Sequence, residues 1–324
     1  MAERSDWACP PHLQPKADEL AFNLAAALDA VVTLKAHIPD DAFTASILGT
    51  ERVGSGVVIG DDGLILTIGY LITEAESIWI TTNDGRVVAG HPLAFDFGSG
   101  LGLVLPLGHL GLAPMPRGSI DTVDVGDDVT VIGGGGRKHA LSTQIFARRE
   151  FAGYWEYVLD TALFTTPAHP AWSGAALVDD GGRLVGIGSL FVQEAFDGEM
   201  VKGNMFVPID LLGPIELAMR TTGRAPGPPR AWLGMYTVEH DGNLVVSALA
   251  DGGPADRAGV HLGDVVLEVA GERATDLADF FRRVWSLGPA GTEVPLTLRR
   301  DGAPFAIGVR AADRAAFLKQ PQLQ

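Results

Sequence analysis

The segment Pro170-Ala171-Trp172-Ser173-Gly174-Ala175-Ala176-Leu177-Val178-Asp179 places a serine among small residues, directly ahead of an apolar run. A turn of two aspartates and two glycines follows, and then a second apolar run, 183–189. A serine on a tight turn, with small neighbours that let a carbonyl group approach backbone N–H groups, meets the needs of acyl transfer. Because such turns are also common ahead of ordinary strands, this segment alone does not make Ser173 a nucleophile.

Composition narrows the class of protein. The chain has 324 residues, 47% of them hydrophobic and 20% charged, which is typical of a globular protein with two or three domains. A formal net charge of −16 argues against nucleic-acid binding, which needs a basic surface. The single cysteine, Cys9, excludes an internal disulfide, and the histidines lack metal-ligand spacing, so we expect no metal and no cofactor.

The sequence also bears on location. The first 20 residues are polar and contain no apolar run of the kind found in a secretory signal. No stretch approaches 18 uninterrupted apolar residues, so membrane insertion is not expected. These observations predict a cytoplasmic protein.

Short β-branched runs separated by Gly, Asp and Asn turns fill residues 31–207, as in an antiparallel barrel. The turn Asp61-Asp62-Gly63 predicts a tight hairpin. Apolar side chains that share one face predict helices at 17–31 and 208–220. Gly213-Pro214 is expected to kink the second helix or split off its first turn.

The Pro- and Gly-rich stretch 225–229 is a stiff connector and gives the clearest domain boundary. We therefore divide the chain into five parts: an irregular N-terminal arm (1–16), a barrel domain with a helix at each end (17–222), a linker (223–229), a small second domain (230–312) and a C-terminal tail (313–324).

Three motifs in the second domain resemble the PDZ domain of HtrA/Deg-type serine proteases. They are Trp232-Leu233-Gly234-Met235, the segment 251–259 and the segment 262–267. The barrel resembles the trypsin-like domain of the same family, since 54–67 is similar to the strand pair that leads into the catalytic histidine and Ser173 lies where the nucleophile lies. The resemblance covers roughly residues 20–311. It implies a mostly β protein, a trypsin-like double β-barrel followed by a PDZ domain.

The chain departs from the family at its catalytic positions. Tyr70 stands where the family has its histidine, Gly100 stands where it has its aspartate, and only Ser173 of the triad remains. Tyrosine, with an ordinary pKa near 10, keeps its proton at neutral pH and cannot replace the histidine as a base. Loss of that base typically costs on the order of 10⁶ in turnover. The oxyanion turn, Ala171-Trp172-Ser173, differs from the family as well.

We therefore expect an HtrA-like pseudoprotease that acts as a peptide- or protein-binding scaffold or regulator. Two alternatives remain open. One is an active serine hydrolase in which His169, four residues before Ser173, is a substitute base. The other is a structural subunit of a larger assembly.

The resemblance implies that the PDZ domain binds a C-terminal or extended peptide as an added strand. The backbone N–H groups of Leu233, Gly234 and Met235 would hold the terminal carboxylate. The side-chain pocket would be shaped by three residues of a helix, Phe280, Phe281 and Val284. The resemblance also implies a homo-oligomer, with a trimer the form expected.

Overall fold

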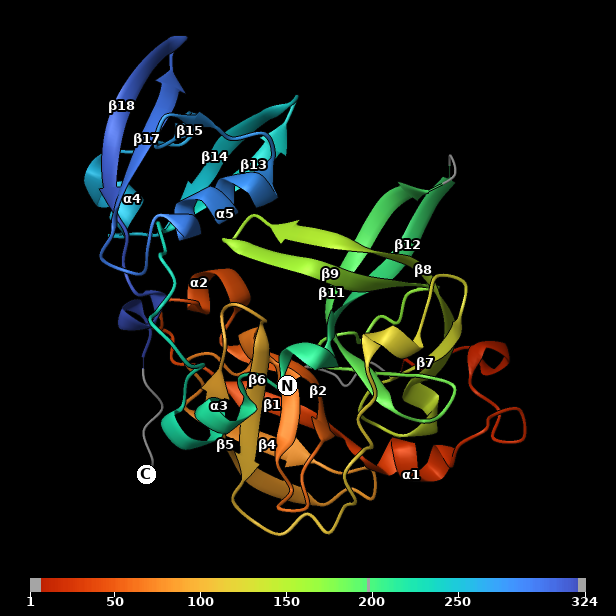
Figure 1. Cartoon of the computed structure of the whole chain (residues 1–324). Helices are drawn as coiled ribbons and strands as arrows, with labels where there is room; N and C mark the ends of the chain where they lie inside the picture. Colours follow the sequence, from red (N-terminus) through yellow and green to blue (C-terminus); the bar gives the residue numbers. More distant parts are fainter. Residues whose placement is uncertain (1–6, 197–198, 320–324) are drawn as a thin grey trace. The chain divides into compact units, whose positions relative to one another are not determined.

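The computed structural model describes residues 7–196 and 199–319, which form two compact units (Figure 1). The first unit contains the described residues up to Arg149, those of Thr161–Pro226, and Lys319. The second contains Gly227–Leu318 together with Glu150–Asp160, the tip of a hairpin whose strands begin in the first unit. The sequence did not predict that this tip belongs with the second domain.

The first barrel of the first unit is closed by six antiparallel strands. Their order is β1 (Val31–His37), β2 (Glu51–Val58), β3 (Ile65–Ile68), β6 (Leu101–Pro106), β5 (Val87–Phe95) and β4 (Ser77–Thr81). The predicted hairpin at Asp61-Asp62-Gly63 is confirmed, since β2 and β3 pair antiparallel and Gly63 has a φ of +81°. The short helix α2 (Ala45–Leu48) precedes β2, and the 3₁₀ turn η2 (Gly69–Leu71) follows β3.

The second barrel is also closed by six strands. Their order is β10 (Ala176–Val178), β11 (Leu184–Phe196), β12 (Glu199–Pro208), β9 (Tyr157–Thr166), β8 (Ala140–Gly153) and β7 (Asp128–Ile132). Leu163, Leu177 and Phe206 are fully buried in its core. The N-terminal arm, which includes the turn η1 (Pro11–Leu13), contributes Cys9 to the same core, and burial raises the pKa of that thiol to about 11. The trypsin-like double barrel expected from the resemblance is confirmed.

The structure differs from the prediction at one of the two helices expected at the ends of the barrel domain and agrees with it at the other. The prediction of a helix over 17–31 is wrong, because only α1 (Leu24–Asp29) is helical. The Asn23 side chain caps α1 at its start by accepting a hydrogen bond from the Ala26 N–H, and β1 begins two residues after its end. The helix over 208–220 is split at Gly213-Pro214, as predicted, into η5 (Ile209–Leu211) and α3 (Glu216–Thr222).

The second unit is built on one antiparallel sheet. Its order is β13 (Met235–His240), β14 (Asn243–Leu249), β15 (Val265–Val269), β17 (Glu293–Arg300) and β18 (Ala303–Arg310), with β16 (Glu272–Arg273) paired to β15. The helices α4 (Pro254–Ala258) and α5 (Leu277–Ser286) complete it, and α5 buries Phe280 and Phe281 in the core. Part of the segment predicted as a tail forms η6 (Arg314–Phe317), and the Phe317 ring packs edge-on against Trp232.

Two remaining turns, η3 (Ile120–Thr122) and η4 (Arg137–His139), connect strands of the barrel unit.

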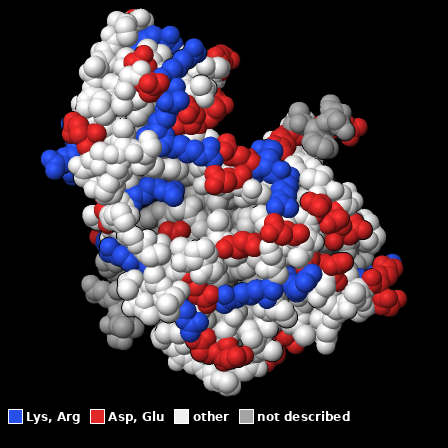
Figure 2. Space-filling model, viewed as in Figure 1, with Lys and Arg blue, Asp and Glu red and all other residues white. Residues whose placement is uncertain are grey.

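None of the helices in the described part of the chain is long and apolar enough to span a membrane. Basic and acidic side chains both occur on the face drawn in Figure 2.

Candidate functional site

The two barrels bring Tyr70 and Ser173 together. Tyr70 lies in η2, directly after β3, and Ser173 lies in the turn before β10. The Tyr70 hydroxyl is 2.7 Å from Ser173 Oγ and donates a hydrogen bond to the Ser189 carbonyl at 2.8 Å. Since that carbonyl can only accept, the single phenolic proton is used there, and the Ser173 hydroxyl donates to the Tyr70 oxygen. The serine proton therefore points at an oxygen that already carries its own proton.

Tyr70 is neutral in this environment. Burial disfavours the phenolate and raises the pKa of Tyr70 to about 12, although the hydrogen bond with Ser173 opposes the rise. A neutral phenol cannot take up the serine proton, because a general base needs a free lone pair of adequate basicity. Tyr70 and Ser173 therefore share a hydrogen bond between two neutral hydroxyl groups.

Gly100 supplies no side chain at the third position. It lies between β5 and β6 with a φ of +78°, and its carbonyl accepts a 2.7 Å hydrogen bond from the Gly69 N–H, next to Tyr70. The nearest acidic residue in the chain, Asp96, uses its carboxylate to accept the Ser99 N–H at 2.6 Å. Gly100 therefore contributes only backbone contacts at this position.

The turn that carries Ser173 is fixed by its backbone. The Ser173 carbonyl accepts the Ser55 N–H at 2.8 Å, and the Gly174 N–H donates to the Gly188 carbonyl at 2.8 Å. Gly174 has a φ of +71°, and a Cβ at this position would lie 2.0 Å from the Ser55 carbonyl oxygen. The turn therefore requires glycine after the serine. Trp172, on its other side, packs its ring against Phe191 with 5.6 Å between centroids.

The structure assigns His169 to a different task from the one predicted. Its side chain is fully buried, its Nε2 lies 3.1 Å from the His139 carbonyl and its Nδ1 accepts the Ala171 N–H at 3.1 Å. Burial lowers the pKa of His169 to about 4, so the ring is neutral at physiological pH. Both ring nitrogens are engaged with backbone groups, which argues against the predicted role of His169 as a substitute base.

The same contact affects the predicted oxyanion turn. An oxyanion is held by backbone N–H groups that point into the cleft and are free to bond it. Of the turn Ala171-Trp172-Ser173, the Ala171 N–H is bonded to the His169 ring instead. One predicted donor is thus occupied, and no pattern in the sequence pairs the Ala171 N–H with the His169 ring.

In the second unit, the backbone N–H groups of Leu233, Gly234 and Met235 converge on one carboxylate. It belongs to Glu156, at the tip of the β8–β9 hairpin. Glu156 Oε1 accepts from Gly234 at 2.7 Å and from Met235 at 3.1 Å, and Oε2 accepts from Leu233 at 2.9 Å. We call residues Leu233–Met235 the carboxylate loop.

Glu156 is buried in this position. Burial raises its pKa to about 7, opposed by the three N–H donors and by the positive charge of Arg314. Sequence reasoning missed Glu156, because an acidic residue at a hairpin tip has no distinguishing pattern. The three helix residues expected to shape the peptide pocket, Phe280, Phe281 and Val284, are all buried in the core of this unit.

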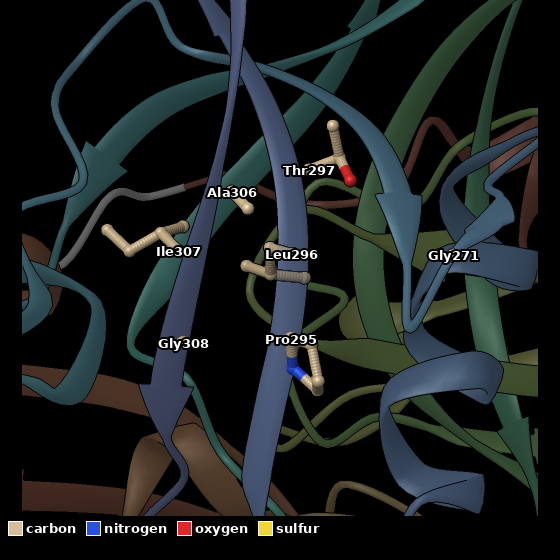
Figure 3. Close-up of a pocket in the computed structure, with 7 residues that line it drawn as sticks. All are labelled: Gly271, Pro295, Leu296, Thr297, Ala306, Ile307 and Gly308. Atoms are coloured by element: carbon tan, nitrogen blue, oxygen red, sulfur yellow. The ribbon is translucent and has the colours of Figure 1, made fainter.

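A further concavity lies on the second unit, over β17 and β18 (Figure 3). It is lined by Gly271, Pro295, Leu296, Thr297, Ala306, Ile307 and Gly308, which include no titratable side chain. The Thr297 hydroxyl is bonded to Glu268. Within residues 7–196 and 199–319, no three His, Cys, Asp or Glu side chains are grouped to hold a metal ion.

Comparisons with known proteins agree with this architecture. Residues 54–187 match the family model of a trypsin-like peptidase domain, and residues 231–310 match that of a PDZ domain. A probable periplasmic serine endoprotease, DegP-like, from Halomonas elongata is 25% identical over 276 residues, 81% of this chain and 57% of that protein. The serine endoprotease DegS of Salmonella typhimurium is 27% identical over 83% of this chain and 79% of its own length.

Solved structures give the same fold. The HtrA-type protease AlgW with a decapeptide superposes with a TM-score of 0.55 at 22% identity, covering 93% of this chain and 100% of that one. A serine endoprotease from Yersinia pestis gives a TM-score of 0.52 at 23% identity, covering 91% of this chain and 99% of that one.

Two further facts follow from the relatives. The chain spans little more than half the length of the DegP-like proteins that it matches. Several relatives carry the word periplasmic in their names, and this finding overturns the cytoplasmic location predicted from the sequence.

Proposed function

Because the chain belongs to the HtrA/Deg-type family of trypsin-like proteases with a PDZ domain, we propose that it is a member that lacks a working triad and binds peptides or proteins as a scaffold or regulator. The degenerate triad consists of Tyr70, Gly100 and Ser173. The PDZ domain supplies the peptide-binding site.

One observation carries the proposal of inactivity, the hydrogen bond of 2.7 Å between the Tyr70 hydroxyl and Ser173 Oγ. A serine hydroxyl attacks a carbonyl only when a base removes its proton during the attack. The oxygen that faces Ser173 belongs to a phenol whose pKa is raised, by burial, to about 12. The Ala171 N–H, bonded to His169, adds support because it is unavailable to a developing oxyanion.

The alternative is an active endoprotease, and the names of the relatives favour it, since they are called serine endoproteases. This alternative needs a base other than His169. The half-buried His139 also has a lowered pKa, because of burial and the nearby charge of Lys138. Its carbonyl, rather than its ring, is what contacts His169.

Labelling with a fluorophosphonate, followed by intact-mass measurement, separates the two possibilities. We expect no adduct on the native chain and none on the Ser173→Ala control. A stoichiometric adduct on the native chain that is absent from Ser173→Ala would overturn the proposal and require a base that this structure does not place beside the serine. The variant Tyr70→His/Gly100→Asp tests whether the cleft regains reactivity when the missing groups return.

Peptide binding is proposed from the PDZ domain and from the backbone donors of the carboxylate loop, which suit a terminal carboxylate. The solved AlgW structure contains a decapeptide by its title. We also propose that the chain forms a homo-oligomer, with a trimer the form to test. Sedimentation velocity of the native chain tests this, and a single monomeric species at micromolar concentration contradicts it.

A further inference from the structure

The carboxylate loop is already filled by a group of its own chain. Three consecutive N–H groups, of Leu233, Gly234 and Met235, all donate to the Glu156 side chain at 2.7–3.2 Å. Converging backbone donors of this kind form an anion site that takes one carboxylate. An external peptide terminus therefore cannot enter the loop while Glu156 remains there.

The backbone of the hairpin tip follows the edge of the sheet as a bound peptide would. β13 is an edge strand, and its Thr237 N–H donates to the Tyr154 carbonyl at 3.1 Å. Thr237 is two residues beyond Met235, and Tyr154 is two residues before Glu156. A peptide added to an edge strand combines a carboxylate in the loop with a main-chain hydrogen bond further along the strand. Both elements of that pattern are present here.

Further contacts hold the tip in place, and all of them lie within the second unit. The Arg282 side chain of α5 bonds both Glu150 and Asp160 at 2.5 Å, across the base of the tip. Arg314 donates to the Trp155 carbonyl at 3.4 Å. Figure 1 shows the yellow-green tip between β8 and β9 beside α5 and β13.

The conformation of the tip is specialised. Glu156 has a φ of +62°, a left-handed conformation that costs a residue with a side chain on the order of 1–3 kcal/mol. At Gly153, a Cβ would lie 2.7 Å from the far edge of the Trp155 ring, so this ring lies directly against the backbone there. Such strain persists where surrounding contacts impose it. The contacts that offset it here are those of the Glu156 carboxylate and the Tyr154 carbonyl.

We propose that residues Tyr154–Glu156 are a built-in ligand of the PDZ domain, and that a partner peptide with a free C-terminal carboxylate binds only by displacing them. The inference rests on the peptide-binding part of the proposed function. The tip is covalently linked to the chain, so it competes at a high effective concentration and weakens the apparent affinity for any external peptide.

The test compares peptide binding by the native chain with binding by Glu156→Ala. The probe is a fluorescein-labelled peptide that copies residues 150–155, followed by an alanine with a free carboxylate. The same peptide with an amidated C-terminus is its negative control. The matched protein control is Glu272→Ala, which removes an exposed acidic residue of β16, outside the tip and the carboxylate loop. Fluorescence anisotropy gives each dissociation constant.

We expect Glu156→Ala to bind the free-carboxylate probe at least tenfold more tightly than the native chain and than Glu272→Ala, with little binding of the amidated probe. In the same variant, amide hydrogen exchange in the carboxylate loop should become faster. A second variant, Glu156→Gln, keeps the side-chain size and should shift affinity in the same direction, which guards against misfolding of the alanine variant.

Equal affinity of the native chain and both Glu156 variants overturns the inference. If all bind tightly, the peptide-binding function stands and only the built-in ligand is refuted. If none binds, although loop exchange shows the variants to be folded, the peptide-binding part of the proposed function fails together with the inference.

Discussion

The hydroxyl of Tyr70 offers a direct test of the interpretation of the cleft. Tyr70→Phe removes only this oxygen and with it two hydrogen bonds, to Ser173 Oγ and to the Ser189 carbonyl. Ser189 is buried and lies where the register of β11 against β12 is interrupted between Gly188 and Leu190. The bulge takes its carbonyl out of the ladder, so the tyrosine is its partner.

The expected cost follows from those two bonds. A typical hydrogen bond contributes a net ~0.5–1.5 kcal/mol, and a buried acceptor left without a partner costs ~1–3 kcal/mol. We therefore expect Tyr70→Phe to lower the free energy of unfolding by about 1–3 kcal/mol. For a unit of this size, that corresponds to a fall in Tm of roughly 2–12 °C.

Differential scanning calorimetry measures the change, and Tyr154→Phe is the control, since that ring is 47% exposed. Surface changes of this kind usually alter stability by less than ~0.5 kcal/mol. Tyr70→Phe should also leave Ser173 without fluorophosphonate label, as in the native chain. The reasoning is refuted if Tyr70→Phe is as stable as the native chain, or if it abolishes a Ser173 adduct that the native chain forms.

Three further predictions concern stability. Gly174→Ala would place a Cβ 2.0 Å from a backbone carbonyl at a φ of +71°, so urea unfolding should show a loss of stability well over the ~1–3 kcal/mol of backbone strain. The control Gly126→Ala has a φ of +99° and no atom within 4 Å, so its loss of stability should equal that strain alone. Burial lowers the pKa of His169 in the folded protein to about 4, so its contribution to the free energy of unfolding is complete above its unfolded pKa. As the pH falls through 4, this contribution is lost, by about 3 kcal/mol in total. In a His169→Asn variant, the free energy of unfolding should not show this fall between pH 6.5 and 4. The pH dependence expected from Glu156 has the opposite sign, since burial raises the pKa of this carboxyl group to about 7, beside a permanently charged Arg314. Its contribution to the free energy of unfolding is present below the unfolded pKa and is lost as the pH rises through 7, by about 3 kcal/mol. Glu156→Gln should remove that loss.

The architecture could be predicted from the sequence because it depends on local patterns. Turn residues such as Asp61-Asp62-Gly63 fix a hairpin through backbone geometry that only a few residue types permit. Gly213-Pro214 interrupts a helix because proline cannot supply the N–H that continues it. The helix expected over 17–31 failed for a related reason. Its apolar spacing suits a helix, but the Asn23 cap and the pairing of Val31 with Val57 restrict it to six residues.

The sites could be predicted only in part, because their closing contacts join residues far apart in the chain. The motifs predict that Tyr70 lies near Ser173, 103 positions away. They do not predict which of the two hydroxyl groups donates the hydrogen bond. The role of His169 depends on the Ala171 N–H and on the His139 carbonyl, which no pattern in the sequence pairs with it. Glu156 and Gly234 are 78 positions apart. Only the folded chain reveals that the hairpin reaches the carboxylate loop.

Ser173 makes polar contacts that have a structural role in this fold. Its hydroxyl donates to Tyr70, and its carbonyl accepts the Ser55 N–H, so the serine joins the two barrels' strands through polar contacts in a partly buried cleft. An alanine here would leave the phenolic oxygen without its donor, at a cost comparable to that of other buried hydrogen bonds. A serine kept for this reason is compatible with a protein that hydrolyses nothing. The same reasoning applies to the carboxylate loop, whose N–H groups are fully used by Glu156 even when no partner is bound. The presence of a family's functional residues therefore identifies the fold, and only the groups bonded to them indicate whether the function remains.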